Sequence, residues 1–204
     1  MALVKYNNNS ISAVTSAASI PSGAMTLIKT LTASSSSTLS FVHGSSDVVL
    51  DSTYPIYKFS FINMHPASST EFQFQTSTNS GSSYGVTLTS TYFYAYHTEA
   101  DNASGLTYFT GGDLAQSTSF QRLSRVHNDN DTSCSGSLTL FNPSSTTFVK
   151  HYMSNFNEEN QTYSQNPYTA GYFNTTSAIN AIQFKMASGN IDSGTIKLYG
   201  IKDS

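Results

Sequence analysis

The sequence predicts an all-β protein: one antiparallel β-sandwich, jelly-roll-like, with a short N-terminal arm. Segments in which apolar and polar residues alternate recur between turn signals along most of the chain, and no segment sustains a helical period. The chain contains 13 Tyr and 13 Phe, residue types that favour strands. Its 204 residues are enough for one domain with a substantial core.

Residues 1–24 differ from the rest of the chain because they lack the aromatic strand pattern. Ile11 and Val14 have helical spacing, and the segment ends at the breaker Pro21-Ser22-Gly23. We interpret 1–24 as an arm that anchors the domain to a partner through Ile11, Val14 and Ile20. The alternative is a frayed terminus.

Residues 25–204 form the expected sandwich domain. Phe72 and Phe74 give the clearest alternation. About ten to twelve short strands with this spacing are typical of a sandwich or barrel, and jelly-roll closure protects the sheet edges. The expected strands cover 25–31, 38–43, 56–62, 71–76, 86–97, 106–110, 118–126, 136–142, 146–156, 168–173, 179–186 and 194–201.

The composition argues against several classes of protein. Charged residues make up 10% of the chain and the net charge is −3, without a basic run, so we expect no nucleic-acid partner. No stretch approaches the roughly 20 apolar residues of a membrane-spanning helix, so we expect no membrane insertion. Cys134 is the only cysteine, which rules out an intrachain disulfide and favours a small buried side chain.

A search for metal sites gives one weak candidate. The five histidines have no metal-binding spacing. The segment His127-Asn-Asp-Asn-Asp131 gathers oxygen ligands of the kind that calcium prefers, but it lacks the EF-hand pattern. An Asx-rich turn is the simpler interpretation. We therefore expect no metal and no cofactor.

Catalytic patterns are similarly weak. There is no GxSxG elbow and no nucleotide-binding glycine pattern, and the acidic residues are few and scattered. We expect no catalytic residues and no enzymatic activity.

One aromatic run has a different interpretation. In Tyr92-Phe-Tyr-Ala-Tyr96, residues Tyr92, Tyr94 and Tyr96 share one face of a strand, and Phe93 and Ala95 share the other. Tyrosine anchors interfaces well, so we predict a partner contact through Tyr92, Tyr94 and Tyr96. The alternative is that the fold covers both faces.

Five segments carry a resemblance to a known family. They are Met1–Tyr6 with Asn8–Ile11, Asn63–Ala67, Asp113–Thr118, Leu140–Val149 and, most characteristic, Ala187–Gly200. With them the chain resembles small virion structural or fibre-associated proteins of marine tailed bacteriophages, including those of cyanobacteria. The likeness covers nearly the whole chain, but it supplies no chemical motif.

The resemblance implies a non-enzymatic virion protein, assembled in the host cytoplasm and exposed on the particle as a capsid decoration, head fibre or tail-fibre component. Its partners would be other virion proteins (capsid, tail or fibre) and further copies of itself, with a trimer suggested by analogy. One alternative is a host-receptor module that binds surface glycans through the loops 97–117 and 157–170. A second is a polysaccharide-cleaving enzyme that uses Asp101 and Asp113.

Overall fold

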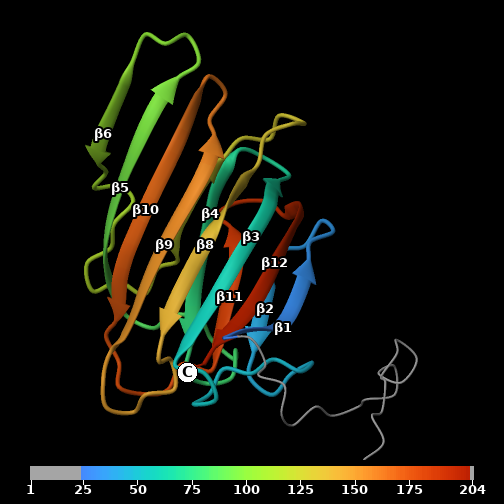
Figure 1. Cartoon of the computed structure of the whole chain (residues 1–204), viewed down its shortest axis with the longest axis vertical. Helices are drawn as coiled ribbons and strands as arrows, with labels where there is room; N and C mark the ends of the chain where they lie inside the picture. The colour runs from blue at the N-terminus through green and yellow to red at the C-terminus, as the bar shows by residue number, and fades with distance from the viewer. Residues whose placement is uncertain (1–23, 203–204) are drawn as a thin grey trace, which may run out of the picture.

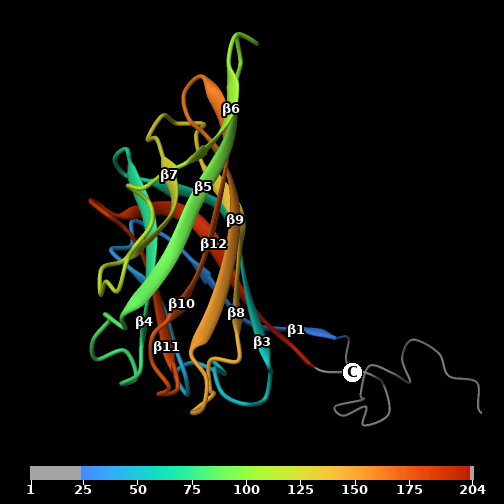
Figure 2. The same cartoon turned by 90° about the vertical axis from the view of Figure 1, so that its left-hand side faces the viewer.

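The computed structural model describes residues 24–202, which form two antiparallel β-sheets packed face to face (Figures 1 and 2). The predicted β-sandwich is therefore confirmed. The large sheet has eight strands. In spatial order they are β1 (Met25–Thr32), β12 (Ile191–Ile201), β3 (Ile56–Pro66), β8 (Cys134–Phe141), β9 (Lys150–Glu159), β10 (Tyr163–Phe173), β5 (Leu88–Thr98) and β6 (Ser104–Tyr108).

The small sheet lies behind the large one in Figure 1 and has four strands. They are β2 (Leu39–Val42), β11 (Ala181–Met186), β4 (Thr70–Ser77) and β7 (Gln121–Val126). All twelve strands overlap the ranges expected from the sequence. The boundaries differ most at β9, which begins at Lys150 rather than at residue 146 and extends to Glu159, and at β10, which begins at Tyr163 rather than at residue 168.

The jelly roll is visible in the strand order. The quartets β1-β12-β3-β8 and β2-β11-β4-β7 have the double Greek-key order of an eight-stranded jelly roll. Two hairpins are inserted into this framework: β5–β6 between β4 and β7, and β9–β10 between β8 and β11. Both hairpins add to the large sheet beyond β8, so the large sheet is twice as wide as the small one.

Aromatic side chains fill the space between the jelly-roll sheets. Phe61 from β3 lies with its ring centroid 5.0 Å from that of Phe184 on β11 and 5.0 Å from that of Phe156 on β9. Phe72 on β4 stacks on Phe184. Cys134 is buried and unpaired in this core, as predicted. Edge-to-face rings of this kind add to the hydrophobic gain of their burial.

The inserted hairpins have a more polar inner face, which is joined to β7. The Ser90 hydroxyl on β5 donates to the Gln121 side-chain carbonyl at 2.6 Å. The Gln121 amide donates in turn to the Gly112 carbonyl at 2.7 Å. Hydrogen bonds therefore hold the extension against the small sheet where the phenylalanine core ends.

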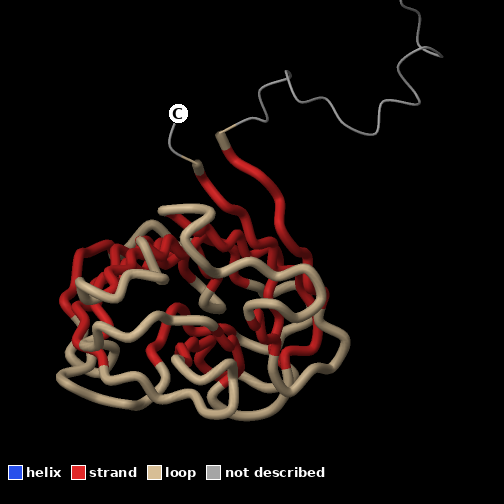
Figure 3. The backbone as a smooth tube through the Cα atoms, turned by 90° about the horizontal axis from the view of Figure 1, so that it is seen from below, coloured by secondary structure: helices blue, strands red, loops and turns tan. Residues whose placement is uncertain are grey.

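Both ends of the described chain leave from one place. The start of β1 and the end of β12 form a two-stranded ribbon, closed by a hydrogen bond from the Lys202 amide to the Ala24 carbonyl at 3.0 Å. The ribbon projects from the outer side of the large sheet, the side that faces away from the small sheet (Figures 2 and 3).

Candidate functional site: the outer face of the large sheet

The aromatic run on β5 has the alternation that the sequence predicts, with Tyr92, Tyr94 and Tyr96 on one face. That face points inward, toward β7. Tyr92 is fully buried, whereas Tyr94 and Tyr96 are half-buried and lie against Phe109 and Tyr163, respectively. Their contact with a partner stays a prediction. Ile11, Val14 and Ile20 lie outside the described residues.

Tyr92 belongs to a buried polar cluster. The Arg122 guanidinium lies 5.2 Å from the centroid of the Tyr92 ring and 5.1 Å from that of Phe109. Arg122 also pairs with Glu71, with 3.1 Å between Nη1 and Oε1. Burial raises the pKa of Tyr92, so this phenol stays neutral. Tyr92 and Arg122 are buried, whereas the Glu71 side chain is 36% exposed, and the cluster fastens β7 to the extension.

Glu158 on β9 lies fully buried beside this cluster. The Ser124 hydroxyl donates to its Oε2 atom, and the Arg125 backbone amide donates to the same atom at 2.6 Å. Burial raises the pKa of Glu158 to about 7, against the lowering effect of these hydrogen bonds. The other oxygen, Oε1, has no hydrogen-bond partner among the described residues. The carboxyl group therefore links the two sheets.

Acidic side chains gather at one end of the sandwich, where the β5–β6, β7–β8 and β9–β10 turns meet. Asp129, Asp131, Glu99 and Glu159 line a cavity of about 290 Å³. Burial and then the neighbouring charges, first that of Glu99, raise the pKa of Glu159. Within residues 24–202 no three acidic, histidine or cysteine side chains are placed to hold a metal ion.

The segment 127–131 forms a closed turn. The hydroxyl of the following Thr132 donates to the His127 carbonyl at 2.6 Å, and the Thr132 amide donates to the Asp129 carbonyl at 3.0 Å. The Asn128 side-chain carbonyl accepts a hydrogen bond from the Ser69 hydroxyl at 2.7 Å, so an Asx side chain also holds this turn in place.

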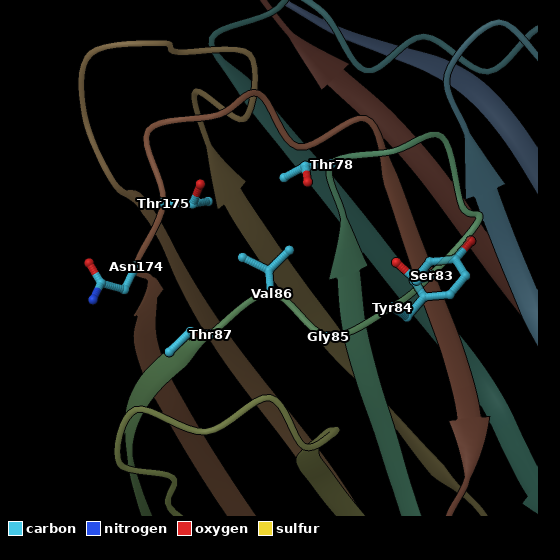
Figure 4. Close-up of a pocket in the computed structure, with 8 residues that line it drawn as sticks. All are labelled: Thr78, Ser83, Tyr84, Gly85, Val86, Thr87, Asn174 and Thr175. Atoms are coloured by element: carbon cyan, nitrogen blue, oxygen red, sulfur yellow. The ribbon is translucent and has the colours of Figure 1, made fainter.

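A pocket of about 330 Å³ lies between the start of β5 and the segment after β10 (Figure 4). Figure 4 shows Val86 pointing into it between Thr78 and Thr175. Its lining carries hydroxyl and amide groups but no carboxylate, imidazole, thiol or amine. The lining residues are Thr78, Ser83, Tyr84, Gly85, Val86, Thr87, Asn174 and Thr175.

A buried amine lies next to this pocket. The Lys150 ammonium donates to the Thr175 carbonyl at 3.1 Å. It forms no ion pair with any described residue, and burial lowers its pKa. The pocket itself offers hydrogen bonds but no acid, base or nucleophile.

The outer face of the large sheet differs from this polar pocket because it is mostly apolar at one end. This is the lower end in Figure 1, where β3 begins and β8 ends. The strand register aligns outward side chains of neighbouring strands in rows that cross the sheet. The lowest row is apolar except for one histidine. From β1 to β10 it contains Met25, Ile201, Ile56, Phe141, His151 and Tyr172.

The next row continues this surface. Its apolar members are Leu27, Tyr199, Met153 and Ala170, and Lys58 and Thr139 lie between them. Met153 is 59% exposed, and Met25 and Leu27 are 53% and 52% exposed. We name these two rows, apart from Lys58 and Thr139, the apolar belt.

Part of the belt is hollowed. Phe141, His151, Met153, Ala170 and Tyr172 line a shallow groove of about 470 Å³ over β8, β9 and β10. Above it, the exposed Phe93 and Tyr168 rings stack in parallel with centroids 5.2 Å apart. Phe93 is thus the most exposed aromatic residue of the run that the sequence singled out.

Sequence reasoning missed the belt because each of its strands also has an apolar inner face. Ile56 precedes the buried Tyr57, and Phe141 follows the buried Leu140. A signal was present: consecutive apolar residues at the strand ends, where alternation should have left one of them polar.

Comparisons with protein-family models, with curated proteins and with solved structures found no match. Within residues 24–202, no helix has the length and apolar character needed to cross a membrane.

Proposed function

We propose that this chain is a non-enzymatic structural protein of a tailed-bacteriophage virion, exposed on the particle as a decoration or fibre-type component. Residues 1–24 anchor it to a capsid, tail or fibre protein, and the sandwich projects as part of a homo-oligomer. The chain assembles in the host cytoplasm and leaves with the particle.

The apolar belt carries this proposal. It occupies the outer face beside the ribbon from which both ends of the described chain leave. Exposed apolar surfaces of this extent mark interaction sites in soluble proteins. Jelly rolls recur in viral capsid and lectin domains, although this fold alone does not assign a function.

The placement of the acidic residues supports a non-enzymatic role. Asp101 pairs with His97 at 3.0 Å, and Asp113 accepts a hydrogen bond from Tyr108 at 2.6 Å. The two aspartates lie beyond opposite ends of β6, whose length is about 16 Å. Paired acids of glycosidases lie about 5–9.5 Å apart, so Asp101 and Asp113 are poorly placed to act together.

The anchoring role of the arm can be tested by supplying particles, during assembly, with either the full chain or a chain truncated to residues 25–204. We expect both chains to fold, because the sandwich begins at Met25, and only the full chain to enter particles. Circular dichroism checks folding, and quantitative mass spectrometry of purified particles checks incorporation. Equal incorporation would contradict the anchor.

A second candidate function is glycan binding. The hairpins β5–β6 and β9–β10 lie side by side, with the Glu99 amide donating to the Thr162 carbonyl at 2.8 Å. Uncharged amides, including Asn155 and Asn157, lie beside Tyr168 on the outer face. Amides next to an aromatic ring are typical of sugar sites. An array of bacterial surface glycans tests this candidate, and the absence of binding would remove it.

A further inference from the structure

We infer that two copies of this chain associate through the apolar belt, large sheet against large sheet, about a two-fold axis between β8 and β9. This inference rests on the homo-oligomer within the proposed function but not on the virion assignment. A chain that dimerises in solution without being a virion protein would satisfy it.

The belt requires a partner surface that is apolar and uncharged. Across its two rows, Lys58 is the only Lys, Arg, Asp or Glu side chain among the described residues. A polyanion or a strongly charged protein would find no complementary charge there. Covering Met153 and its neighbours with another apolar surface gains the free energy of removing them from water.

A second large sheet provides such a surface. Sheets stack face to face about 10 Å apart, with their outward side chains interdigitated. The face that two copies would share extends beyond the belt to strand β5 and to a third outward row, which contains Lys197, Asn155, Tyr168 and Phe93. Seven strands spaced about 4.8 Å apart, with these three rows about 7 Å apart, present roughly 700 Å² per copy. A standard interface buries about 800 Å² per partner, so the face is of suitable size.

The strand order makes this face self-complementary. Four strands lie on each side of the boundary between β8 and β9. A two-fold axis parallel to the strands at that boundary places β8 over the partner's β9, and β3 over the partner's β10. Phe141 then faces His151 of the partner subunit, and Ile56 faces Tyr172 of the partner subunit, so apolar and aromatic groups meet along the axis.

The flanks also match under this symmetry. Lys197 on β12 lies in the same row as Phe93 on β5, and the axis brings the ammonium of one copy over the Phe93 and Tyr168 rings of the other. A cation that lies over the face of an aromatic ring is attracted to that ring. Lys197 on β12 of each copy therefore lies opposite the Phe93 and Tyr168 pair of the other copy.

The projecting ribbon has space beside the partner. Strand β6 pairs only with Phe93–His97, so it leaves the lower part of β5 as a free edge. The axis places the ribbon of each copy, with the exposed Met25 and Leu27, at this free edge of the other. The two ribbons then flank the interface on opposite sides.

The first test measures the mass of the full chain by sedimentation equilibrium over a range of protein concentrations. We expect a dimer for the unmodified chain. Met153→Glu should raise the dissociation constant of the dimer at least about tenfold, because symmetry places two buried charges in one interface. The matched control is Leu106→Glu on the edge strand β6, where Leu106 is 72% exposed. This variant should remain dimeric.

A second measurement detects the interface without a substitution that weakens the dimer. Met153→Cys places a thiol near the axis, and Cys134 is buried and does not compete. A short bismaleimide should crosslink two Met153→Cys chains into a covalent dimer. It should not crosslink Leu106→Cys chains.

Several results would overturn the inference. An unmodified chain that stays monomeric at high concentration would assign the belt to another partner, such as a different virion protein or a glycan. A trimer would contradict the two-fold arrangement. Equal dissociation constants for the unmodified chain and folded Met153→Glu, with no Met153→Cys crosslink, would place the interface elsewhere.

Discussion

The Ser124 hydroxyl on β7 donates a hydrogen bond to the buried carboxyl group of Glu158 on β9, and thereby joins the small sheet to the large one. The next residue on β7 adds its backbone amide to the same oxygen. These contacts lie where the phenylalanine core gives way to the polar inner face of the inserted hairpins. A titratable group therefore lies at the junction of the jelly roll and its extension.

This junction should make stability depend on pH. Burial raises the pKa of Glu158 from 4.5 to about 7. Between these values the folded chain binds a proton that the unfolded chain has released, so the free energy of unfolding falls as the pH rises. The loss for this group is on the order of 3 kcal/mol by pH 7 and above.

Urea denaturation of the parent chain and of Glu158→Gln between pH 4 and 8 measures this contribution. We expect Glu158→Gln to lack this pH-dependent loss of unfolding free energy, because the amide does not titrate. The unfolding free energy of the variant, relative to that of the parent, should therefore rise from pH 4.5 to 7. Parallel pH profiles would contradict the assignment.

Arg122 should contribute strongly to stability, because it lies against two rings and pairs with Glu71. Arg122→Met removes the charge over the two rings and the ion pair to Glu71, which keeps its hydrogen bond from Gln73. The expected cost is about 1–3 kcal/mol. Arg125→Met is the matched control, since Arg125 is exposed on the same strand. Its cost should stay within about 0.5 kcal/mol. Similar losses for both variants in chemical denaturation would contradict the buried role of Arg122.

Gly136 on β8 lies where an added side chain would meet the backbone of β9. A Cβ atom there would clash with the Asn155 carbonyl oxygen and lie 2.8 Å from the Phe156 Cα atom, and neither backbone atom can move easily. Gly136→Ala should therefore destabilise the chain by at least about 2 kcal/mol. At Gly85, the nearest atoms lie 3.8 Å from a Cβ, so Gly85→Ala should be nearly neutral. Thermal unfolding compares the two variants. Equal changes in their melting temperatures would show that β8 and β9 are less closely packed at Gly136.

Lys150 should destabilise the fold at neutral pH. Burial lowers its pKa and no described acidic residue pairs with it, so the folded chain holds its proton less tightly than the unfolded chain. The cost is largest at low pH and disappears as the pH approaches the ordinary lysine value of 10.5. Lys150→Met should thus raise the melting temperature at pH 7, and raise it less at pH 9.5. A lower melting temperature at pH 7 would show that the hydrogen bond to Thr175 outweighs the desolvation.

Alternation in the sequence was enough to predict the strands and much of the core. Phe72 and Phe74 lie inside as expected, and in the expected strand 194–201 the alternating residues Ile196 and Leu198 are buried. Pairing was not predictable, because no local pattern shows that β5–β6 and β9–β10 are inserted beside β8. Neither was the extension of β3 to Pro66, which follows from a bulge at Asn63 with a φ of 50°.

The orientation of the aromatic run could not be predicted for a related reason. Tyr92 and Phe93 would each suit a core, so alternation defines two faces without showing which one is inside. In the structure Tyr92 faces inward, where Arg122 of β7 lies over its ring. The exposed face that results contains Phe93, and it continues down the sheet toward the belt.

Immunogold electron microscopy of purified phage particles, with an antibody against residues 25–204, tests the central claim most directly. The proposed function predicts gold label on intact particles, over the head for a capsid decoration or head fibre and over the tail for a tail-fibre component. Particles without label, and without this chain in their protein gel, would contradict the virion assignment.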